Sequence, residues 1–112
     1  MKLNEYQQLA MRTSNKALSQ KEHVINGALG LNGEAGEVAD VVKKAYMQGH
    51  RLDVEHIIKE LGDCLWYIAE TAEALGVDME TIAQKNLEKL ERRYPAGEFS
   101  AERSINREAG DI

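Results

Sequence analysis

The sequence predicts an all-α protein built as an antiparallel bundle of four main helices. Helix-forming residues dominate its 112 positions, and Pro95 is the only proline. Apolar residues recur at helical spacing along two long central segments, which indicates helices with one buried face. Short polar loops separate the segments, and short loops favour antiparallel neighbours.

Apolar spacing and capping residues locate the first two helices. One covers about residues 4–18, with Asn4 as its N-cap and Gln7 at the capping-box position. The next covers about residues 24–48 and ends before Gly49, a residue type favoured just after a helix.

Two further helices show the same signals. Asp53 caps a third helix that runs to Leu75, and Gly76 follows it. Asp78 caps a fourth helix. This helix ends before Pro95, because proline lacks the backbone N–H that would continue it.

The chain divides into a helical domain over residues 1–95 and a tail over residues 96–112. The tail is polar and has few apolar anchors. We expect it to be extended, with a neighbouring subunit as a candidate surface for its packing.

Composition narrows the class of protein. Nineteen acidic residues against 14 basic ones give a net charge of −5, which disfavours binding to nucleic acid. Cys64 is the only cysteine, so disulfide frameworks and multi-cysteine metal sites are excluded. No stretch approaches the roughly 20 apolar residues of a membrane span. We therefore expect a soluble, cytoplasmic protein that does not contact membranes.

Two pairs of acidic residues lie on consecutive predicted helices. Glu34 and Glu37 form the first pair, and Glu60 and Asp63 form the second. Residues three apart point to one side of a helix, so antiparallel packing can bring all four carboxylates together. Single pairs of this kind are common on solvated faces, and that interpretation stays open for each pair alone.

Four converging carboxylates need a counter-charge, because like charges raise one another's pKa. Oxygen ligands suit Mg²⁺ or Mn²⁺. A di-iron bundle would need Glu-x-x-His motifs, which neither pair provides. His23, His50 and His56 lie at helix starts or in a loop, where we expect surface or capping roles.

Glycines surround the acidic pairs. Gly27, Gly30, Gly33 and Gly36 recur at every third position, and Gly62 lies inside the second pair. Each costs a helix roughly 0.5–1 kcal/mol relative to alanine. They therefore indicate a cleft wall, tight packing between helices, or both.

The fourth predicted helix adds polar and basic side chains. Asn86 falls within its apolar stripe, and Lys89 and Arg93 follow three and seven residues later. A basic rim on a solvated face is the alternative. Cations that can bind phosphate oxygens, together with carboxylates that bind Mg²⁺, predict a phosphate-processing site.

These motifs resemble those of the MazG-like all-α nucleoside triphosphate pyrophosphohydrolases, which are related to dimeric dUTPases. The resemblance covers almost the whole chain and rests on four stretches: "EYQQLAMRT", "ALGLNGEAGEVADVVKK", "IIKELGDCLWYIAE" and "NLEKLERRYPAGEFSAERSINR". It implies Mg²⁺-dependent hydrolysis of (deoxy)nucleoside triphosphates to monophosphates and pyrophosphate. It also implies a homodimer or homotetramer.

The resemblance also implies roles for individual residues. The four acidic residues are the implied metal ligands and catalytic groups: Glu34, Glu37, Glu60 and Asp63. The implied substrate-binding residues are Lys44, Tyr67, Asn86, Lys89 and Arg93. Trp66 is expected to point away from the carboxylates, toward a helix or subunit interface.

Two other functions stay open at this point. One is a non-catalytic helical module that binds nucleotide or metal, and the other is a helical dimerisation protein with solvated carboxylates. The motifs do not identify the preferred base or sugar.

Overall fold

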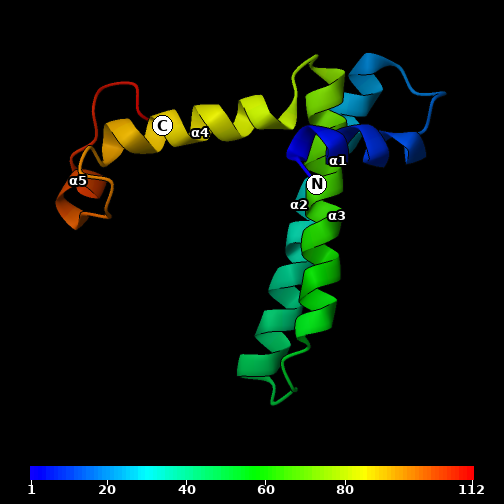
Figure 1. The fold of residues 1–112 in the computed structure, drawn as a ribbon. Helices are drawn as coiled ribbons and strands as arrows, with labels where there is room; N and C mark the ends of the chain where they lie inside the picture. The colour runs from blue at the N-terminus through cyan, green and yellow to red at the C-terminus, as the bar shows by residue number, and fades with distance from the viewer. The chain divides into compact units, whose positions relative to one another are not determined.

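Two long helices, α2 (Gln20–Met47) and α3 (Val54–Ala74), lie side by side in opposite directions and form a hairpin (Figure 1). The loop between them begins where Gly49 adopts a φ of +72°. The N–H groups of Gln48 and His50 both donate to the carbonyl of Lys44 there. Glycine reaches this left-handed conformation without a Cβ clash, so the predicted glycine stop after α2 is confirmed.

The structure is a computed structural model that describes residues 1–112. It consists of two compact units, Met1–Met79 and Glu80–Ile112, and each is described by itself. All of its regular elements are helical, which confirms the all-α class. No helix has the length and apolar character needed to cross a membrane.

Side chains cap the N-termini of both hairpin helices. The Ser19 hydroxyl accepts from the N–H of Glu22 at 3.2 Å, and Glu22 Oε1 accepts from the N–H of Ser19 at 3.0 Å. This complete capping box starts α2 at Gln20, about one turn earlier than predicted. The predicted cap of α3 is confirmed, since Asp53 Oδ1 accepts from the N–H of His56 at 3.0 Å.

The first predicted helix is shorter than expected. α1 (Leu3–Ala10) gives way to a 3-10 turn, η1 (Met11–Thr13), so the predicted continuation to residue 18 is wrong. Side chains occupy carbonyls that a longer helix would use. Thr13 Oγ1 donates to the Ala10 carbonyl at 2.8 Å, and Lys16 Nζ donates to the Met11 carbonyl at 2.5 Å.

The predicted cap of α1 is also wrong. Lys2 occupies the N-cap position, and Gln7 is buried instead of closing a capping box around Asn4. The Gln7 amide donates to the Val77 carbonyl at 3.1 Å and accepts from the N–H of Met79 at 2.7 Å. Gln7 therefore joins α1 to the connection that follows α3.

The buried core of one chain is small. Its buried hydrophobic residues are Met11, Ala69, Ala72 and Met79. Large apolar side chains stay exposed elsewhere on the two hairpin helices: Leu29, Tyr46, Met47, Val54, Ile58 and Leu61. A single chain thus leaves much of its predicted apolar stripes uncovered.

The second unit contains most of α4 (Met79–Arg93), which ends before Pro95 as predicted. The expected extended tail is wrong in part, because α5 (Ala101–Ile105) forms a short helix within it. Arg103 Nε donates to the Arg93 carbonyl at 3.0 Å and ties α5 to the end of α4. The assembly of four helices into one antiparallel bundle remains a prediction.

Candidate metal centre

Three carboxylates from the two hairpin helices converge. Glu34 extends from α2, Glu60 and Asp63 extend from α3, and one oxygen of each lies within 4.8 Å of the others. Residues three apart share one side of α3, and the antiparallel packing sets that side against Glu34. Glu37 lies one turn further along α2, outside this group, and is exposed.

The neighbouring carboxylates of this cluster change the pKa of Glu34. The pKa of Glu34 is raised above that of an ordinary glutamate, chiefly by its hydrogen bond to Glu60. Burial and the negative charges of Glu60, Asp63 and Glu37 raise it further. Protonation of Glu34 would relieve the repulsion in the metal-free chain. The donors are all carboxylate oxygens, a set that fits a hard divalent cation.

A histidine holds one member of the cluster. His56 Nε2 lies 2.9 Å from Glu60 Oε1, one turn away on α3. We expected only a surface or capping role for His56. Its ring also contacts Glu60, a candidate metal ligand. Such contacts orient the ligands of metal sites. The spacing of four residues between His56 and Glu60 was a signal for this pair in the sequence.

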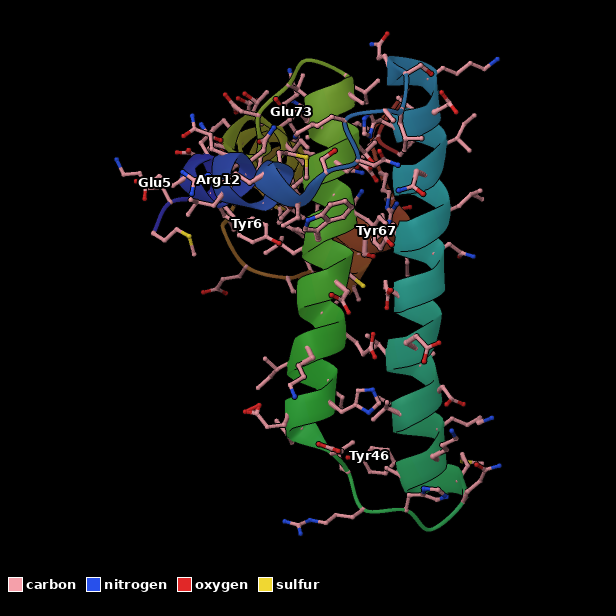
Figure 2. All side chains as sticks on the ribbon, turned by 90° about the vertical axis from the view of Figure 1, so that its right-hand side faces the viewer. Glu5, Tyr6, Arg12, Tyr46, Tyr67 and Glu73 are labelled. Atoms are coloured by element: carbon pink, nitrogen blue, oxygen red, sulfur yellow. The ribbon has the colours of Figure 1, made fainter.

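A cavity of about 330 Å³ adjoins the carboxylates and is lined by Glu34, Asp63, Trp66 and Tyr67. The two aromatic rings meet edge to face, with centroids 5.1 Å apart. Trp66 Nε1 donates to Thr13 Oγ1 at 2.9 Å, so this residue serves a helix interface as expected. Its expected direction away from the carboxylates is wrong, since its side chain shares their cavity. Figure 2 shows Tyr67 where α3 faces α2.

Lys44 lies two turns beyond Glu37 on α2. Its ammonium group is 2.7 Å from Asp40 Oδ2, and this contact is the main cause that raises the pKa of Lys44. Lys44 also lines a cavity of about 230 Å³ at the loop end of the hairpin, together with His50, His56 and Arg51, of which only Arg51 was missed by sequence reasoning.

Comparison with known proteins assigns this chain to a family. Residues 20–97 match the family described as the MazG nucleotide pyrophosphohydrolase domain. The chain belongs to the MazG family. A Mycobacterium phage L5 protein named "Gene 37 protein" is 42% identical over 76 residues, covering 62% of this chain and 64% of the phage protein. The chain therefore spans less than two thirds of the length of that relative. No solved structure matches.

The MazG match contains every residue that the sequence analysis assigned to a site. MazG proteins generally depend on divalent metals, and the carboxylate cluster supplies ligands of that kind. The remaining assigned residues of this MazG domain, Asn86, Lys89 and Arg93, belong to the second unit.

These three residues of the MazG domain have different surroundings within their unit. Asn86 is exposed, so the burial expected from its place in the apolar stripe of α4 is wrong. Lys89 is half-buried. Arg93 is bound by Asp111, a partner that the sequence analysis did not anticipate.

The glycines of the MazG domain fall into two groups. A Cβ on Gly27 would lie 2.1 Å from Thr71 Oγ1, and one on Gly30 would lie 2.3 Å from the Tyr67 ring. Tight packing between α2 and α3 therefore explains both. A Cβ on Gly33, Gly36 or Gly62 would meet nothing within 4 Å, so packing inside one chain does not explain these.

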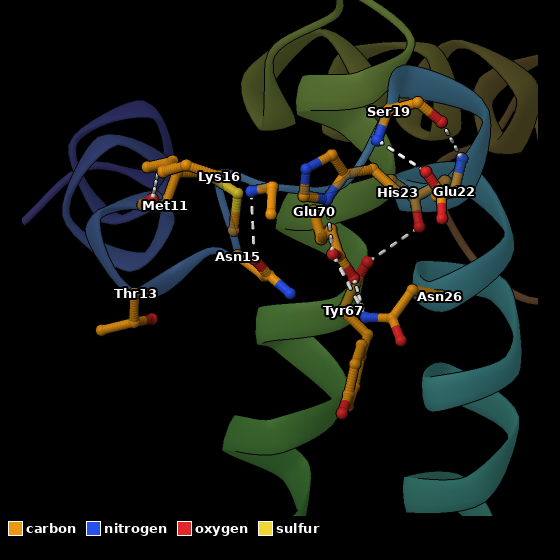
Figure 3. Close-up of polar contacts among 12 residues, drawn as sticks. Met11, Thr13, Asn15, Lys16, Ser19, Glu22, His23, Asn26, Tyr67 and Glu70 are labelled. Atoms are coloured by element: carbon orange, nitrogen blue, oxygen red, sulfur yellow. Dashed lines mark hydrogen bonds and ion pairs between the residues drawn. The ribbon is translucent and has the colours of Figure 1, made fainter.

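One buried acidic residue of the MazG domain escaped the sequence analysis. Glu70 is 2% exposed, and its carboxylate lies 2.8 Å from His23 Nδ1 and accepts from Asn26 Nδ2 at 2.9 Å (Figure 3). His23 thus joins α2 to α3, which corrects its expected surface role. The position of Glu70 on the buried side of α3 was the signal that could have revealed a polar partner.

Proposed function

We propose that this MazG domain hydrolyses a (deoxy)nucleoside triphosphate to the monophosphate and pyrophosphate in a metal-dependent reaction. The convergence of Glu34, Glu60 and Asp63 supports the proposal most directly. The raised pKa of Glu34, caused chiefly by its hydrogen bond to Glu60, also supports carboxylates that lie together and not separately in solvent. Family membership supports the reaction type.

Glu34, Glu60 and Asp63 are the proposed ligands, and Glu37 is proposed to complete the set from the next turn of α2. The ion is proposed to be Mg²⁺, with Mn²⁺ as a substitute. When bound, such an ion neutralises phosphate charge and lowers the pKa of its water. His56 keeps Glu60 turned toward the other carboxylates through its 2.9 Å contact.

The aromatic cavity beside the cluster is the proposed position of the nucleoside. Tyr67 and Trp66 offer ring surfaces there, next to Glu34 and Asp63. Nucleobases stack on aromatic side chains without strong dependence on their identity. The cavity therefore supports binding of a nucleoside without specificity for one base.

Cationic and amide side chains are the proposed contacts for the phosphates and sugar. Lys44 lies on α2 beyond the carboxylates, and its charge is balanced by Asp40 in the free chain. Asn86, Lys89 and Arg93 are the proposed contacts from α4.

We further propose that the protein is a homodimer or homotetramer. The support is the apolar surface that one chain leaves exposed, including Leu29, Ile58 and Leu61, which are 69%, 57% and 53% exposed. Exposed apolar side chains that gather into a large patch mark interaction sites, and these residues are the proposed members of one.

The decisive experiment separates the products formed from each member of a panel of nucleoside and deoxynucleoside triphosphates, with Mg²⁺ or EDTA. We expect pyrophosphate and a monophosphate with Mg²⁺ only. Asp63→Ala should lower the rate by about 100-fold or more with its helical signal retained, since even residues behind a metal ligand contribute 10–100-fold.

The matched control is Glu55→Gln, an exposed carboxylate in the first turn of α3, which should keep full activity. Orthophosphate as the first product would contradict the proposed reaction. Nucleotide or metal binding without turnover would favour the non-catalytic module. Unchanged metal affinity in Glu60→Ala would favour the dimerisation protein.

A further inference from the structure

A partly buried ion pair ties the C-terminal segment of the chain to α4. Arg93 Nε donates to Asp111 Oδ2 at 2.9 Å, and Arg93 Nη2 donates to Asp111 Oδ1 at 2.7 Å. The two side chains are only 12% and 10% exposed. This is the two-pronged geometry with which a guanidinium group binds a carboxylate or a phosphate.

Two more cations act on the same carboxylate. The pKa of Asp111 is lowered chiefly by its hydrogen bonds to Arg93, and the positive charges of Arg107 and Lys89 lower it further. Three cationic side chains therefore act on this carboxylate, Arg93 by direct contact and Arg107 and Lys89 through their charge. This local excess of positive charge contrasts with the acidic balance of the whole chain.

The local backbone supports this arrangement. Arg107 Nε donates to the Ser104 carbonyl at 3.1 Å, which places its side chain over the end of α5. Arg103 donates to the carbonyls of Arg92 and Arg93 at 3.1 and 3.0 Å. Arg103 therefore holds α5 against α4. Arg107 and Asp111 come next along the chain, just after this anchored helix.

We propose that Lys89, Arg93 and Arg107 form a binding site for a phosphate or pyrophosphate group, and that the Asp111 carboxylate occupies this site in the free chain. The inference rests on the proposed function for the source of the phosphate group, and it adds Arg107 to the residues that bind it. Asp111 acts as an internal competitor, because two carboxylate oxygens satisfy the same guanidinium donors as two phosphate oxygens.

The test measures binding of inorganic pyrophosphate to the full chain by calorimetry in EDTA, where the carboxylate cluster of the first unit has no metal to bridge it to an anion. Asp111→Asn should bind pyrophosphate about 10-fold more tightly than the wild type, because a charge-assisted pair no longer competes. Asp111→Glu keeps the competing charge and should stay near the wild type. Arg107→Gln in the Asp111→Asn background should lose most of the gain.

Two exposed residues of the same unit provide controls. Glu98→Gln removes a negative charge away from the ion pair, and Arg92→Gln removes an exposed positive one. Both should leave pyrophosphate affinity within about 2-fold, as expected for screened surface charges. An equal gain in Glu98→Gln would overturn the proposal, since net charge alone would then explain it.

Asp111→Asn that binds no more tightly than the wild type would also overturn the proposal. If the tail loosens, Arg93 is still released and Lys89 stays on α4, so tighter binding is still expected, and only the part of the gain that depends on Arg107 is reduced. The outcome is separate from the proposed reaction. Turnover of triphosphates with Mg²⁺ tests the carboxylate site, whereas pyrophosphate binding in EDTA tests these cations.

Discussion

Glu34 on α2 and Glu60 on α3 share a hydrogen bond although both are acids, and this contact raises the pKa of Glu34. Asp63 adds a third carboxylate within 4.8 Å. Protonation of Glu34 therefore favours the cluster when no metal is bound. Three carboxylates this close repel one another when all are ionised, so the cluster costs the folded chain stability unless a proton or a cation offsets the charge.

Replacing Glu34 by glutamine should stabilise the metal-free protein at neutral pH. Because the pKa of Glu34 is raised in the folded state, its stabilising contribution is complete below the ordinary glutamate pKa of about 4.3 and is lost as the pH rises through the raised value. Glu34→Gln mimics the protonated acid at every pH. We expect a higher midpoint of thermal unfolding in EDTA at pH 7 and no gain near pH 4.

The same variant should lose its response to metal. Mg²⁺ that binds the folded state raises the unfolding midpoint of the wild type by mass action, and Glu34→Gln should show little of this shift. Glu91→Gln, on the exposed side of α4, is the control and should respond as the wild type does. A full Mg²⁺ shift in Glu34→Gln would remove Glu34 from the ligand set.

Gly30→Ala should destabilise the hairpin. The new Cβ would lie 2.3 Å from the Tyr67 ring, which is itself packed against Trp66, so the ring must move. Overpacking of this kind costs about 1–3 kcal/mol. Denaturant unfolding measures the loss, and nucleotide binding should weaken with it because Tyr67 lines the cavity beside the carboxylates.

Gly33→Ala is the matched control, one turn further along α2. A Cβ there meets nothing within 4 Å, so the change should stabilise the chain by about 0.5–1 kcal/mol through helix propensity. Destabilisation that grows with protein concentration would instead show that a second subunit packs on Gly33. Equal effects of both alanines on monomer stability would contradict the packing difference between the two glycines.

Helix positions could be predicted from the sequence wherever the signal was local. Asp53 and Gly49 act through backbone groups within four residues of themselves, and both appear as expected. Gln7 shows where this reasoning stops. Its spacing from Asn4 fits a capping box. The Gln7 side-chain amide instead forms hydrogen bonds with backbone groups about 70 residues away, which only the folded chain brings within reach.

In the candidate site, too, some features could be predicted from local spacing and others depend on how the helices pack. The spacing of Glu60 and Asp63 predicts a shared side of α3, and helix geometry alone brings that about. The register of α2 against α3 then decides that Glu34 joins them while Glu37 does not. Contacts such as Arg93 with Asp111 depend on the fold of residues 96–112, for which the sequence shows no strong periodicity.

Gln7→Met should lower the free energy of unfolding by about 1–3 kcal/mol for each polar group left buried without a partner. The groups at risk are the N–H of Met79 and the carbonyl of Val77. Gln8→Met, an exposed neighbour on α1, should change stability by no more than about 0.5 kcal/mol. Equal effects in urea unfolding would mean that water replaces the Gln7 amide without cost.

The C-terminal segment should loosen in acid. Because the pKa of Asp111 is lowered in the folded state, the stability it contributes is present above the ordinary aspartate pKa of about 3.9 and is lost as the pH falls through the lowered value. Protection factors for hydrogen exchange at the N–H groups of Ser104 and Asn106, which close the turns of α5, should drop at low pH while those of α3 persist. Asp111→Asn should show the lower protection already at pH 7 and little further change in acid. Equal protection in the wild type and Asp111→Asn at pH 7 would show that Arg103 alone holds α5 in place.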